Sequence, residues 1–143
     1  MNKQASEYAS MLFGAPVPIQ LSATRQLKSR KATKEELSIK AEIPGCSDVY
    51  AGASKGQKRR LDVALVLAFR EIVARRSSRA CDQFFVDELF DGLDASGCET
   101  VVELLRTVAG GAPVILITHD PKLKAVADRV IHVHHTDGIA RVA

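Results

Sequence analysis

The sequence predicts an α/β fold. Its parallel sheet has strands connected by crossover helices, and an antiparallel hairpin precedes this sheet in the chain. Two stretches of alternating apolar and polar residues flank a basic turn within residues 19–43, which is typical of a hairpin with one wet face. Residues 83–135 follow the order strand, helix, strand, helix, strand, and strands joined by helices pair in parallel. The chain has 143 residues, 46% of them hydrophobic, so it can bury the core of one domain.

The first half of the chain predicts two helices around the hairpin. Segment 1–13 has apolar residues at helical spacing, and the run "GAPVP" at 14–18 ends it. The strands "IQLSATRQL" and "ELSIKAEI" follow, joined by "KSRKATK", and the loop "PGCSDVYAGAS" comes next. Residues 54–76 form the longest predicted helix, whose broad apolar face predicts extensive burial. The residues of that face are Val63, Leu65, Val66, Leu67, Phe69, Ile72 and Val73.

The second half predicts the parallel part of the sheet. "QFFVD" and "PVILIT" are short apolar runs of the kind found in strands buried on both faces. Between them "ASGCETVVELLRTVA" predicts a helix that ends at Gly110, and Pro121 suits the first position of the next helix, "PKLKAVA". "DRVIHVHH" alternates and predicts a third strand. His132 and His134 share one face of it, but without a third ligand nearby a wet strand face is favoured over a metal site.

Charge and cysteine content narrow the function classes. Residues 1–80 contain 15 Lys and Arg against 7 Asp and Glu, whereas residues 81–143 contain 5 against 10, for a net charge of +3. Either both halves have solvated surfaces, or a basic surface faces a polyanion and an acidic end faces a metal. Three widely spaced cysteines without a CxxC pair predict neither a disulfide framework nor a zinc knuckle, and fit a reducing cytoplasm. No apolar run is long enough to span a membrane, and the first ten residues lack the layout of a signal peptide.

Adjacent carboxylates, Asp87 and Glu88, end the first apolar strand of this half. Ligands of parallel sheets bind beyond the carboxyl ends of the strands, and His119 and Asp120 end the next strand, so both pairs are expected to face one crevice. Such a pair suits nucleotide hydrolysis, in which one carboxylate holds Mg²⁺ and the other polarises the attacking water. Alone, an acidic strand end also arises by chance where an apolar run meets a turn.

Three further features bear on this hypothesis. Ser54, Gly56 and Gln57 would place a hydroxyl, a free backbone N–H and an amide at the start of the long helix, where a phosphate can bind. The alternative is that Ser54 is an ordinary helix cap. "GLDASG" forms a tight acidic loop after the first strand, and "ITHD" places His119 where it could hydrogen-bond a γ-phosphate, orient water or be merely structural.

These four features, in this order, resemble the C-terminal lobe of an ABC-type ATPase head, which is the C-terminal half of a P-loop fold. "ASKGQ" resembles the signature motif LSGGQ, and "FFVDE" resembles Walker B with its catalytic glutamate. "GLD" resembles the D-loop and "ITHD" the H-loop, so the match covers residues 50–135. The signature departs from the usual pattern at Ala53, which replaces Leu, and at Lys55, which replaces Gly.

The resemblance implies ATP and Mg²⁺ as cofactors and assigns a role to each motif residue. Asp87 would be the Mg²⁺ ligand, Glu88 the general base, and His119 the γ-phosphate switch. The residues that would contact ATP held by the opposing head of a dimer are Ser54, Gly56, Gln57 and Asp94. Asp91 has no such role and is expected to be a solvated loop acid.

Within that family the chain resembles the SMC-like DNA-repair ATPases, including the SbcC-type exonuclease subunit and the bacteriophage recombination endonuclease subunits. Leu89 stands where transporter ATPases usually read Pro, and "KGQKRRLDVALVLAFREI" resembles this branch. The resemblance makes segment 1–13 the stub of a returning coiled-coil arm, and Arg59–Arg60 and Asp62 the link between nucleotide state and that arm. It also implies a nuclease subunit and double-stranded DNA ends as partners, in the cytoplasm of a cell or of a phage host.

Basic residues in the hairpin turn are candidate contacts to DNA phosphates, with an ordinary exposed turn as the alternative. They are Lys28, Arg30, Lys31 and Lys34.

The phosphate loop GxxxxGK[ST] does not occur in these 143 residues. We therefore expect an N-terminal Walker A lobe, either on a separate chain or in a longer protein, and little ATP turnover by this chain alone. The part of the sheet that would join that lobe should present an unpaired edge and an apolar patch. Two alternatives remain open: another ABC-type cassette, such as a transporter, and a non-catalytic half-head that regulates a complete one.

Overall fold

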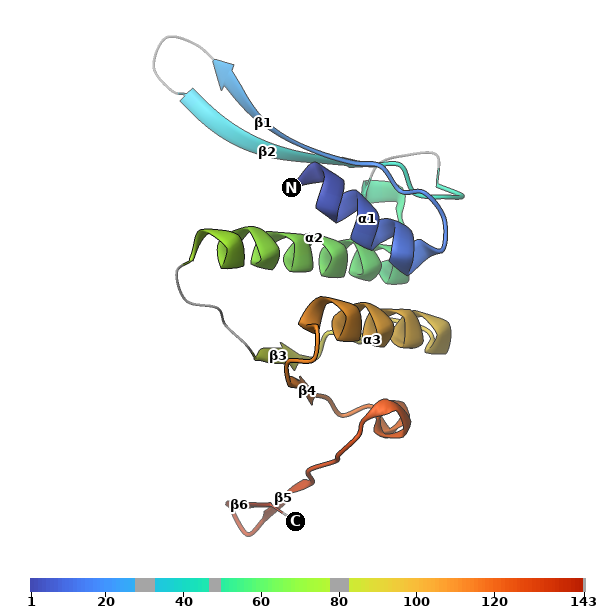
Figure 1. Cartoon of the computed structure of the whole chain (residues 1–143), viewed down its shortest axis with the longest axis vertical. Coiled ribbons are helices and arrows are strands. Elements are labelled where there is room, and N and C mark those ends of the chain that lie inside the picture. The colour runs from blue at the N-terminus through green and yellow to red at the C-terminus, as the bar shows by residue number, and fades with distance from the viewer. Residues whose placement is uncertain (28–32, 47–49, 78–82, 143) are drawn as a thin grey trace.

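The computed structural model describes residues 1–27, 33–46, 50–77 and 83–142. Its helices and strands lie in successive layers (Figure 1). The hairpin of β1 (Ile19–Leu27) and β2 (Thr33–Ala41) lies over the helices α1 (Asn2–Phe13) and α2 (Lys55–Arg76). Below them lie α3 (Ala95–Ala109) and the sheet of β3 (Phe84–Asp87) and β4 (Val114–Ile117). Helical turns η1 (Tyr50–Gly52) and η2 (Pro121–Val126) and the hairpin β5 (Val133–Thr136) and β6 (Ile139–Val142) complete the chain. The mixed α/β fold predicted from the sequence is confirmed.

The first helix packs on the second through the apolar face that the sequence predicted. Its buried side chains are Ala5, Tyr8, Ala9 and Leu12. The Tyr8 hydroxyl crosses to α2 and donates a hydrogen bond of 2.7 Å to Glu71 Oε2. Gly14 ends α1 with φ 64°, a left-handed conformation that glycine adopts without steric cost. A polar contact within an apolar interface therefore fixes how α1 and α2 lie on each other.

The hairpin pairs in antiparallel register from Ile19 opposite Ala41 to Leu27 opposite Thr33. Its inner end is anchored to α1, because the Ser6 hydroxyl accepts a 2.8 Å hydrogen bond from the Ile19 backbone N–H. The four basic residues proposed as DNA contacts cannot be placed from this structure. Lys28, Arg30 and Lys31 lie outside the described residues, and the Lys34 side chain is not described either.

The burial predicted for the second helix is only partly correct. Its buried residues are Leu61, Val63, Ala64, Leu65, Leu67 and Ala68. Val66, Phe69 and Val73, which we also expected to be buried, are exposed. The physical reason is that α1 and α3 cover only part of the apolar circumference of α2.

The central sheet has two strands, with β3 and β4 parallel and Phe84 opposite Val114. The crossover helix α3 packs its apolar face into the core, and its buried residues include Val101, Leu104 and Leu105. Each strand therefore has one edge without a partner strand among the described residues. Phe85, Ile115 and Ile117 are exposed on this sheet, although we expected both strands to be buried on both faces. The apolar patch and the unpaired edge expected from the sequence are present.

The prediction that a third strand joins this sheet is wrong. β5 pairs with β6 in a separate antiparallel hairpin rather than with β4. The turn between them contains Asp137 at φ 52° and Gly138 at φ 78°, and Asp-Gly at such positive φ angles favours a tight hairpin over a strand that continues the parallel sheet. The helix expected at "PKLKAVA" is the 3₁₀ turn η2, with Pro121 in its first turn. None of the helices in the described ranges is long and apolar enough to cross a membrane.

Candidate functional site

Three of the predicted site residues meet at the carboxyl ends of β3 and β4. Asp87 is the last residue of β3 and pairs with Ile117, and the Glu88 N–H donates a 3.0 Å hydrogen bond to the Ile117 carbonyl. His119 follows β4 by two residues, and its Nδ1 lies 3.9 Å from Glu88 Oε1. The Glu88 and His119 side chains are 62% and 75% exposed. The parallel pairing thus brings two segments 31 residues apart to one edge, as expected for such a sheet.

The Asp87 carboxylate is accessible at the end of β3. Its residue is exposed, and no hydrogen bond or ion pair engages its carboxylate within the described part of the chain. The described residues contain no group of three or more His, Cys, Asp or Glu that could hold a metal by itself. Mg²⁺ bound to a nucleotide needs only one or two protein carboxylates, because phosphate and water supply the other ligands. The residues present therefore fit Mg²⁺ that arrives with ATP, and do not form an independent metal centre.

The backbone of Glu88 adopts a conformation that is uncommon for its residue type. Its φ is +47°, and among the described non-glycine residues only Asp137 shares a positive value. Holding a residue with a side chain in this region costs on the order of 1–3 kcal/mol and requires surrounding contacts that fix it. The strand thus ends abruptly at Glu88, and the carboxylate stands at a sharp corner beyond the sheet.

The start of α2 uses two of the predicted phosphate-binding residues as a helix cap. Ser54 Oγ accepts a 3.2 Å hydrogen bond from the Gln57 N–H, and Gln57 Oε1 accepts one of 2.8 Å from the Ser54 N–H. This reciprocal pair is a capping box, so the structural alternative given for Ser54 describes what the chain does by itself. Gly56 lies in the first turn, where a Cβ would come 3.4 Å from the Gly92 carbonyl. Their contacts to ATP remain predictions.

Arginines on α2 attach this helix to the loop that follows β3. Arg59 Nε donates a 2.8 Å hydrogen bond to the Leu89 carbonyl, and its Nη2 donates to the Glu88 carbonyl. Arg60 Nη2 forms a 2.9 Å ion pair with Asp94 Oδ1. The family resemblance links both arginines to the coiled-coil arm, whereas the contacts seen here lead to the acidic loop. A link to the arm remains a prediction.

Asp94, the predicted D-loop acid, caps α3. Its Oδ1 accepts a 2.9 Å hydrogen bond from the Gly97 N–H, which together with the Arg60 ion pair lowers the pKa of its carboxyl group. Gly97 makes this arrangement possible, because a Cβ there would lie 2.7 Å from Asp94 Oδ1 and 3.0 Å from Arg60 Nη2. Whether Asp94 also contacts a nucleotide remains a prediction.

Lys55, the residue that departs from the usual signature, lies over Gly92 in the same loop. A Cβ at Gly92 would lie 2.9 Å from the Lys55 Cε and 3.2 Å from its Cδ. The φ of Gly92 is +82°, so this position excludes larger residues both by conformation and by the closeness of the lysine chain. The departure at Lys55 is thus accommodated within the chain by the glycine opposite it.

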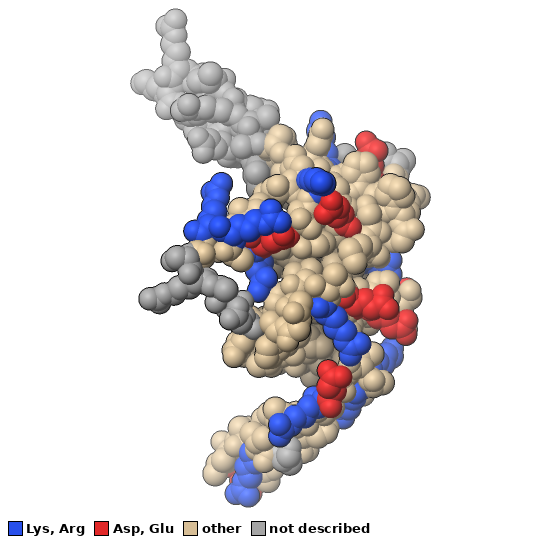
Figure 2. All heavy atoms as spheres, viewed as in Figure 1, with Lys and Arg blue, Asp and Glu red and all other residues tan. Residues whose placement is uncertain are grey.

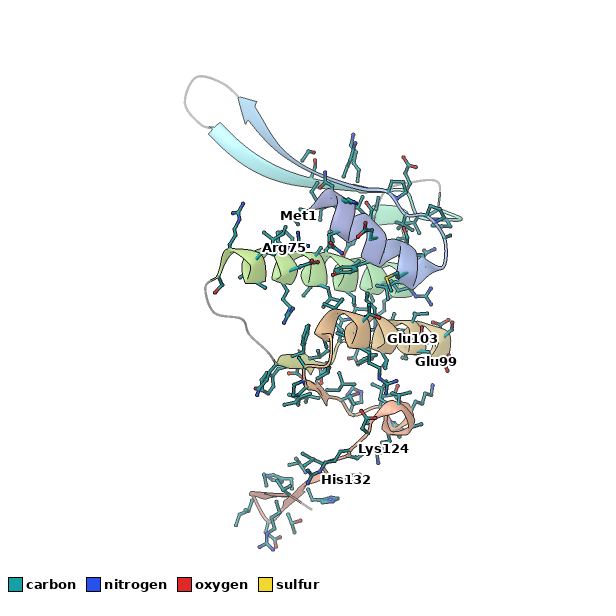
Figure 3. The ribbon with its side chains drawn as sticks, viewed as in Figure 1. Met1, Arg75, Glu99, Glu103, Lys124 and His132 are labelled. Atoms are coloured by element: carbon teal, nitrogen blue, oxygen red, sulfur yellow. The ribbon has the colours of Figure 1, made fainter. Side chains whose placement is uncertain are left out.

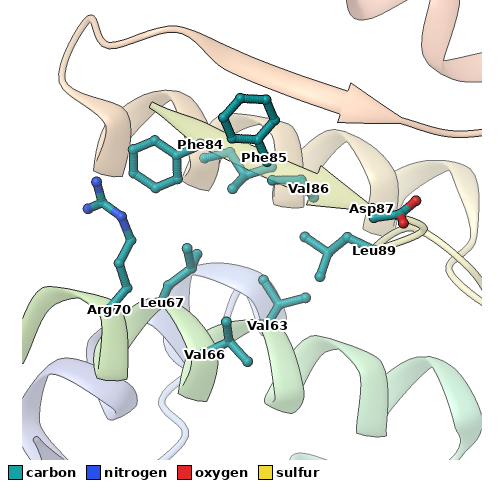
Figure 4. Close-up of a pocket in the computed structure, with 10 residues that line it drawn as sticks. Val63, Val66, Leu67, Arg70, Phe84, Phe85, Val86, Asp87 and Leu89 are labelled. Carbon is teal, nitrogen blue, oxygen red and sulfur yellow. The ribbon is translucent and has the colours of Figure 1, made fainter. Parts of the chain in front are cut away.

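An apolar cleft of about 360 Å³ lies beside the site, between α2 and β3 (Figure 4). Val63, Val66 and Leu67 of α2 face Phe84 and Leu89 across it. The residue at its end is Arg70, whose guanidinium carbon stacks 3.7 Å from the centre of the Phe84 ring. Because its walls are almost wholly apolar, the cleft suits the side chains of another protein segment better than it suits a phosphate.

The histidines near the C-terminus do not form part of this site. His132 and His134 stack with ring centres 5.9 Å apart, and both are exposed. Figure 3 shows His132 in the extended segment that leads away from α2 and α3. His134 belongs to β5, whereas His132 precedes that strand, so the strand face that we expected the two histidines to share is not formed as predicted.

The chain is similar in sequence to parts of a DNA-repair ATPase, of phage exonuclease subunits and of transport ATPases. No protein-family model matches it. "Exonuclease subunit 2" of Enterobacteria phage T4 is 34% identical over 71 residues, which is 49% of this chain and 12% of that protein. The "DNA double-strand break repair Rad50 ATPase" of Archaeoglobus fulgidus is 28% identical over 142 residues, 98% of this chain and 16% of the relative. A "Probable export ATP-binding/permease protein" of Pseudomonas fluorescens is 30% identical over 128 residues, 89% of this chain and 17% of the relative. The chain thus spans less than a fifth of each of these relatives.

Solved structures show the same fold. A structure described under "ATP-driven dimerization and DNA stimulated activation of SMC ATPases" superposes with a TM-score of 0.77 at 21% identity, covering 99% of this chain and 81% of the other. The Smc head domain of Pyrococcus yayanosii superposes with a TM-score of 0.73 at 22% identity, covering 99% and 26%. The chain thus has the fold of SMC ATPase head domains, and its sequence is similar to parts of a Rad50 ATPase and of a phage exonuclease subunit.

Proposed function

We propose that this chain supplies the catalytic carboxylates of a composite head that binds and hydrolyses ATP in DNA double-strand-break repair or recombination. The observation that carries the proposal is the meeting of Asp87, Glu88 and His119 at the ends of two parallel strands. This arrangement supports the proposal, because ligands of such sheets bind at the edge where these three residues lie.

Each of the three side chains has a distinct task in this proposal. Asp87 would hold Mg²⁺, which would supply charge neutralisation on the phosphates of ATP. Glu88 accepts a proton from the attacking water and orients it. His119 donates a hydrogen bond to the γ-phosphate, and its closeness to Glu88 keeps the phosphate and the water together.

A second lobe must supply the phosphate loop, since GxxxxGK[ST] does not occur in this sequence. The exposed apolar surface beside the site supports this requirement. Its exposed residues on β3, β4 and α2 are Val66, Phe69, Val73, Phe85, Ile115 and Ile117. A patch of this kind next to two unpaired strand edges is typical of a surface that another part of the protein covers. We propose that an N-terminal Walker A lobe covers it.

Head dimerisation completes the proposed site from the other side. Ser54, Gly56, Gln57 and Asp94 would contact ATP bound to the opposing head, with the capping box holding the first turn of α2 in place. The description of a solved neighbour by "ATP-driven dimerization" supports this step. The proposed boundaries within the chain are an arm stub at 1–13, a hairpin at 19–43, a signature helix at 54–76 and a Walker B to H-loop core at 83–135.

A nuclease subunit and double-stranded DNA are the proposed partners. The names of the phage exonuclease subunit and of the archaeal repair ATPase support this assignment. On the face shown in Figure 2, Lys and Arg side chains occur in small groups with Asp and Glu beside some of them, rather than as one continuous basic field. DNA contact on this face would therefore rest on local groups of basic side chains, and the salt dependence of binding would count those contacts.

The test co-expresses this chain with its Walker A lobe, which is taken from the same longer protein or from a neighbouring gene. ATP hydrolysis by the pair is then measured. Glu88→Gln should lower kcat at least about a hundredfold, which is the usual contribution of a positioned general base. Asp91→Asn is the matched control, because Asp91 is an exposed acid of the same loop that has no role in the reaction. Equal loss in both variants, or none in Glu88→Gln, would contradict the assignment.

The match to an export ATPase supports a second candidate, a transport-type cassette. The two functions differ in what stimulates the reaction. Addition of linear double-stranded DNA to the lobe pair should raise kcat if the chain serves DNA repair. Hydrolysis that DNA leaves unchanged would favour the transport-type cassette, and hydrolysis that survives Glu88→Gln would favour the regulatory half-head.

A further inference from the structure

The loop from Glu88 to Asp94 is attached at three points to the first two turns of α2. Arg59 holds its start by donating to the Glu88 and Leu89 carbonyls, and the Lys55 chain covers its middle at Gly92. Arg60 pairs with Asp94 at its end. Lys55 and Arg59 are four residues apart, so they lie on one face of the helix. The first two turns of α2 therefore contact the loop that carries the proposed base at its start, middle and end.

The Arg59 contacts act on the unusual backbone angle of Glu88. The torsion about the N–Cα bond of Glu88 decides in which direction the chain leaves β3. It also decides where the Glu88 side chain points relative to the sheet. The two carbonyls held by Arg59 are the first two after this bond, so holding them relative to α2 restricts this torsion, which is φ +47° in the structure. The Glu88 carbonyl also accepts a long bond of 3.4 Å from the Asp91 N–H, which by itself closes only a local turn.

A guanidinium is suited to this task. Its planar fork carries several N–H donors in fixed directions, so it can hold two carbonyl oxygens at once, which the ammonium group of a lysine cannot do with the same geometry. Arg59 belongs to α2, which packs against α1 and α3, and its anchor is therefore independent of the loop. We propose, on the basis of the function proposed above, that Arg59 is a positioning residue that holds Glu88 in its left-handed conformation and so aims its carboxylate at the attacking water.

The Lys55–Gly92 contact should contribute to the same positioning from the middle of the loop. A methyl group at Gly92 would push on the Lys55 chain and displace the loop from α2. Gly111 provides the matched control, because its φ of +95° is similarly unfavourable for alanine, whereas a Cβ there has open space. The difference between Gly92→Ala and Gly111→Ala therefore measures the lysine contact, with the backbone cost removed.

The test uses the chain paired with its Walker A lobe. Arg59→Ala should lower kcat for ATP hydrolysis by about ten- to a hundredfold, because a misplaced catalytic group costs about that much, with KM for ATP changing less than about twofold. Arg76→Ala, on an exposed residue in the last turn of the same helix, should leave both unchanged. Gly92→Ala should lower kcat more than Gly111→Ala. When both glycine variants are made in a chain that also carries Lys55→Ala, the difference between their kcat values should be smaller.

A second measurement does not depend on hydrolysis. Backbone scalar couplings and chemical shifts of Glu88 in the full chain report its φ angle, which should leave the left-handed region in Arg59→Ala and stay there in Arg76→Ala. An unchanged angle together with an unchanged kcat would overturn the inference and leave the proposed function standing. If the unmodified pair does not hydrolyse ATP, the proposed function fails, and the φ angle still decides whether Arg59 holds Glu88.

Discussion

Replacing Phe85 should weaken attachment of the Walker A lobe without unfolding the chain. Phe85 is 67% exposed on β3, and its neighbour in register, Ile115, is exposed on the same face. Full burial of a Phe side chain stabilises by about 1.5–3 kcal/mol, so covering the exposed two thirds contributes about 1–2 kcal/mol. Phe85→Thr keeps a strand-forming residue and should raise the Kd for the lobe about 5- to 30-fold.

Isothermal titration of the chain with the Walker A lobe measures this effect. Met11→Ala is the control, because Met11 is also exposed but lies on α1, away from the sheet. Chemical unfolding should show that Phe85→Thr changes the stability of the isolated chain by less than about 1 kcal/mol, as expected of an exposed site. Equal Kd values for the Phe85 variant and the original chain would refute the reasoning that the exposed face of β3 is a lobe interface.

Three further predictions concern the chain itself. Tyr8→Phe removes the hydrogen bond that chiefly lowers the pKa of Glu71, so chemical unfolding should show a loss of about 1–2 kcal/mol at pH 7. As the pH falls below 4.5, the variant should lose less further stability than the original chain, because less of its stability depends on ionised Glu71. Burial raises the pKa of Tyr8 from 10.0 to about 12, so the original chain should lose more stability than the variant as the pH rises from 10 to 12. Burial also raises the pKa of the Cys98 thiol, so timed alkylation read by peptide mass spectrometry should modify half-buried Cys46 well before Cys98. Leu104→Ala should cost about 2–5 kcal/mol in thermal unfolding, because Leu104 is fully buried.

Local sequence patterns predicted the elements that satisfy their own backbone and bury their own apolar face. One example is α1, in which Ala5, Tyr8 and Leu12 recur at helical spacing and form its buried face. Another is the pair of short apolar strands that end at Asp87 and Ile117 and pair with each other. Strand order in a parallel crossover unit then places Glu88 and His119 at one edge by geometry alone. This is why the meeting of the acidic and histidine motifs could be anticipated.

Contacts between segments could not be predicted in this way. Whether Val66 and Phe69 are buried depends on whether another layer covers α2, and the sequence pattern is the same in both cases. The partners of Arg59 and Arg60 depend on side-chain reach across 29 to 34 residues of chain, which periodicity does not encode. The separate β5–β6 hairpin is a different case. Its Asp137–Gly138 turn is a local sequence signal, and it favours pairing of β5 with β6 over pairing in the parallel sheet.

The central claim is that this chain holds catalytic carboxylates over a phosphate that another lobe must bind. The most direct measurement is steady-state ATP hydrolysis by the purified chain alone, by the Walker A lobe alone and by the two together, with Mg²⁺ present. We expect background rates from each part and turnover from the pair, in proportion to the amount of the limiting lobe. Turnover by this chain alone, or by the Walker A lobe without it, would contradict the claim.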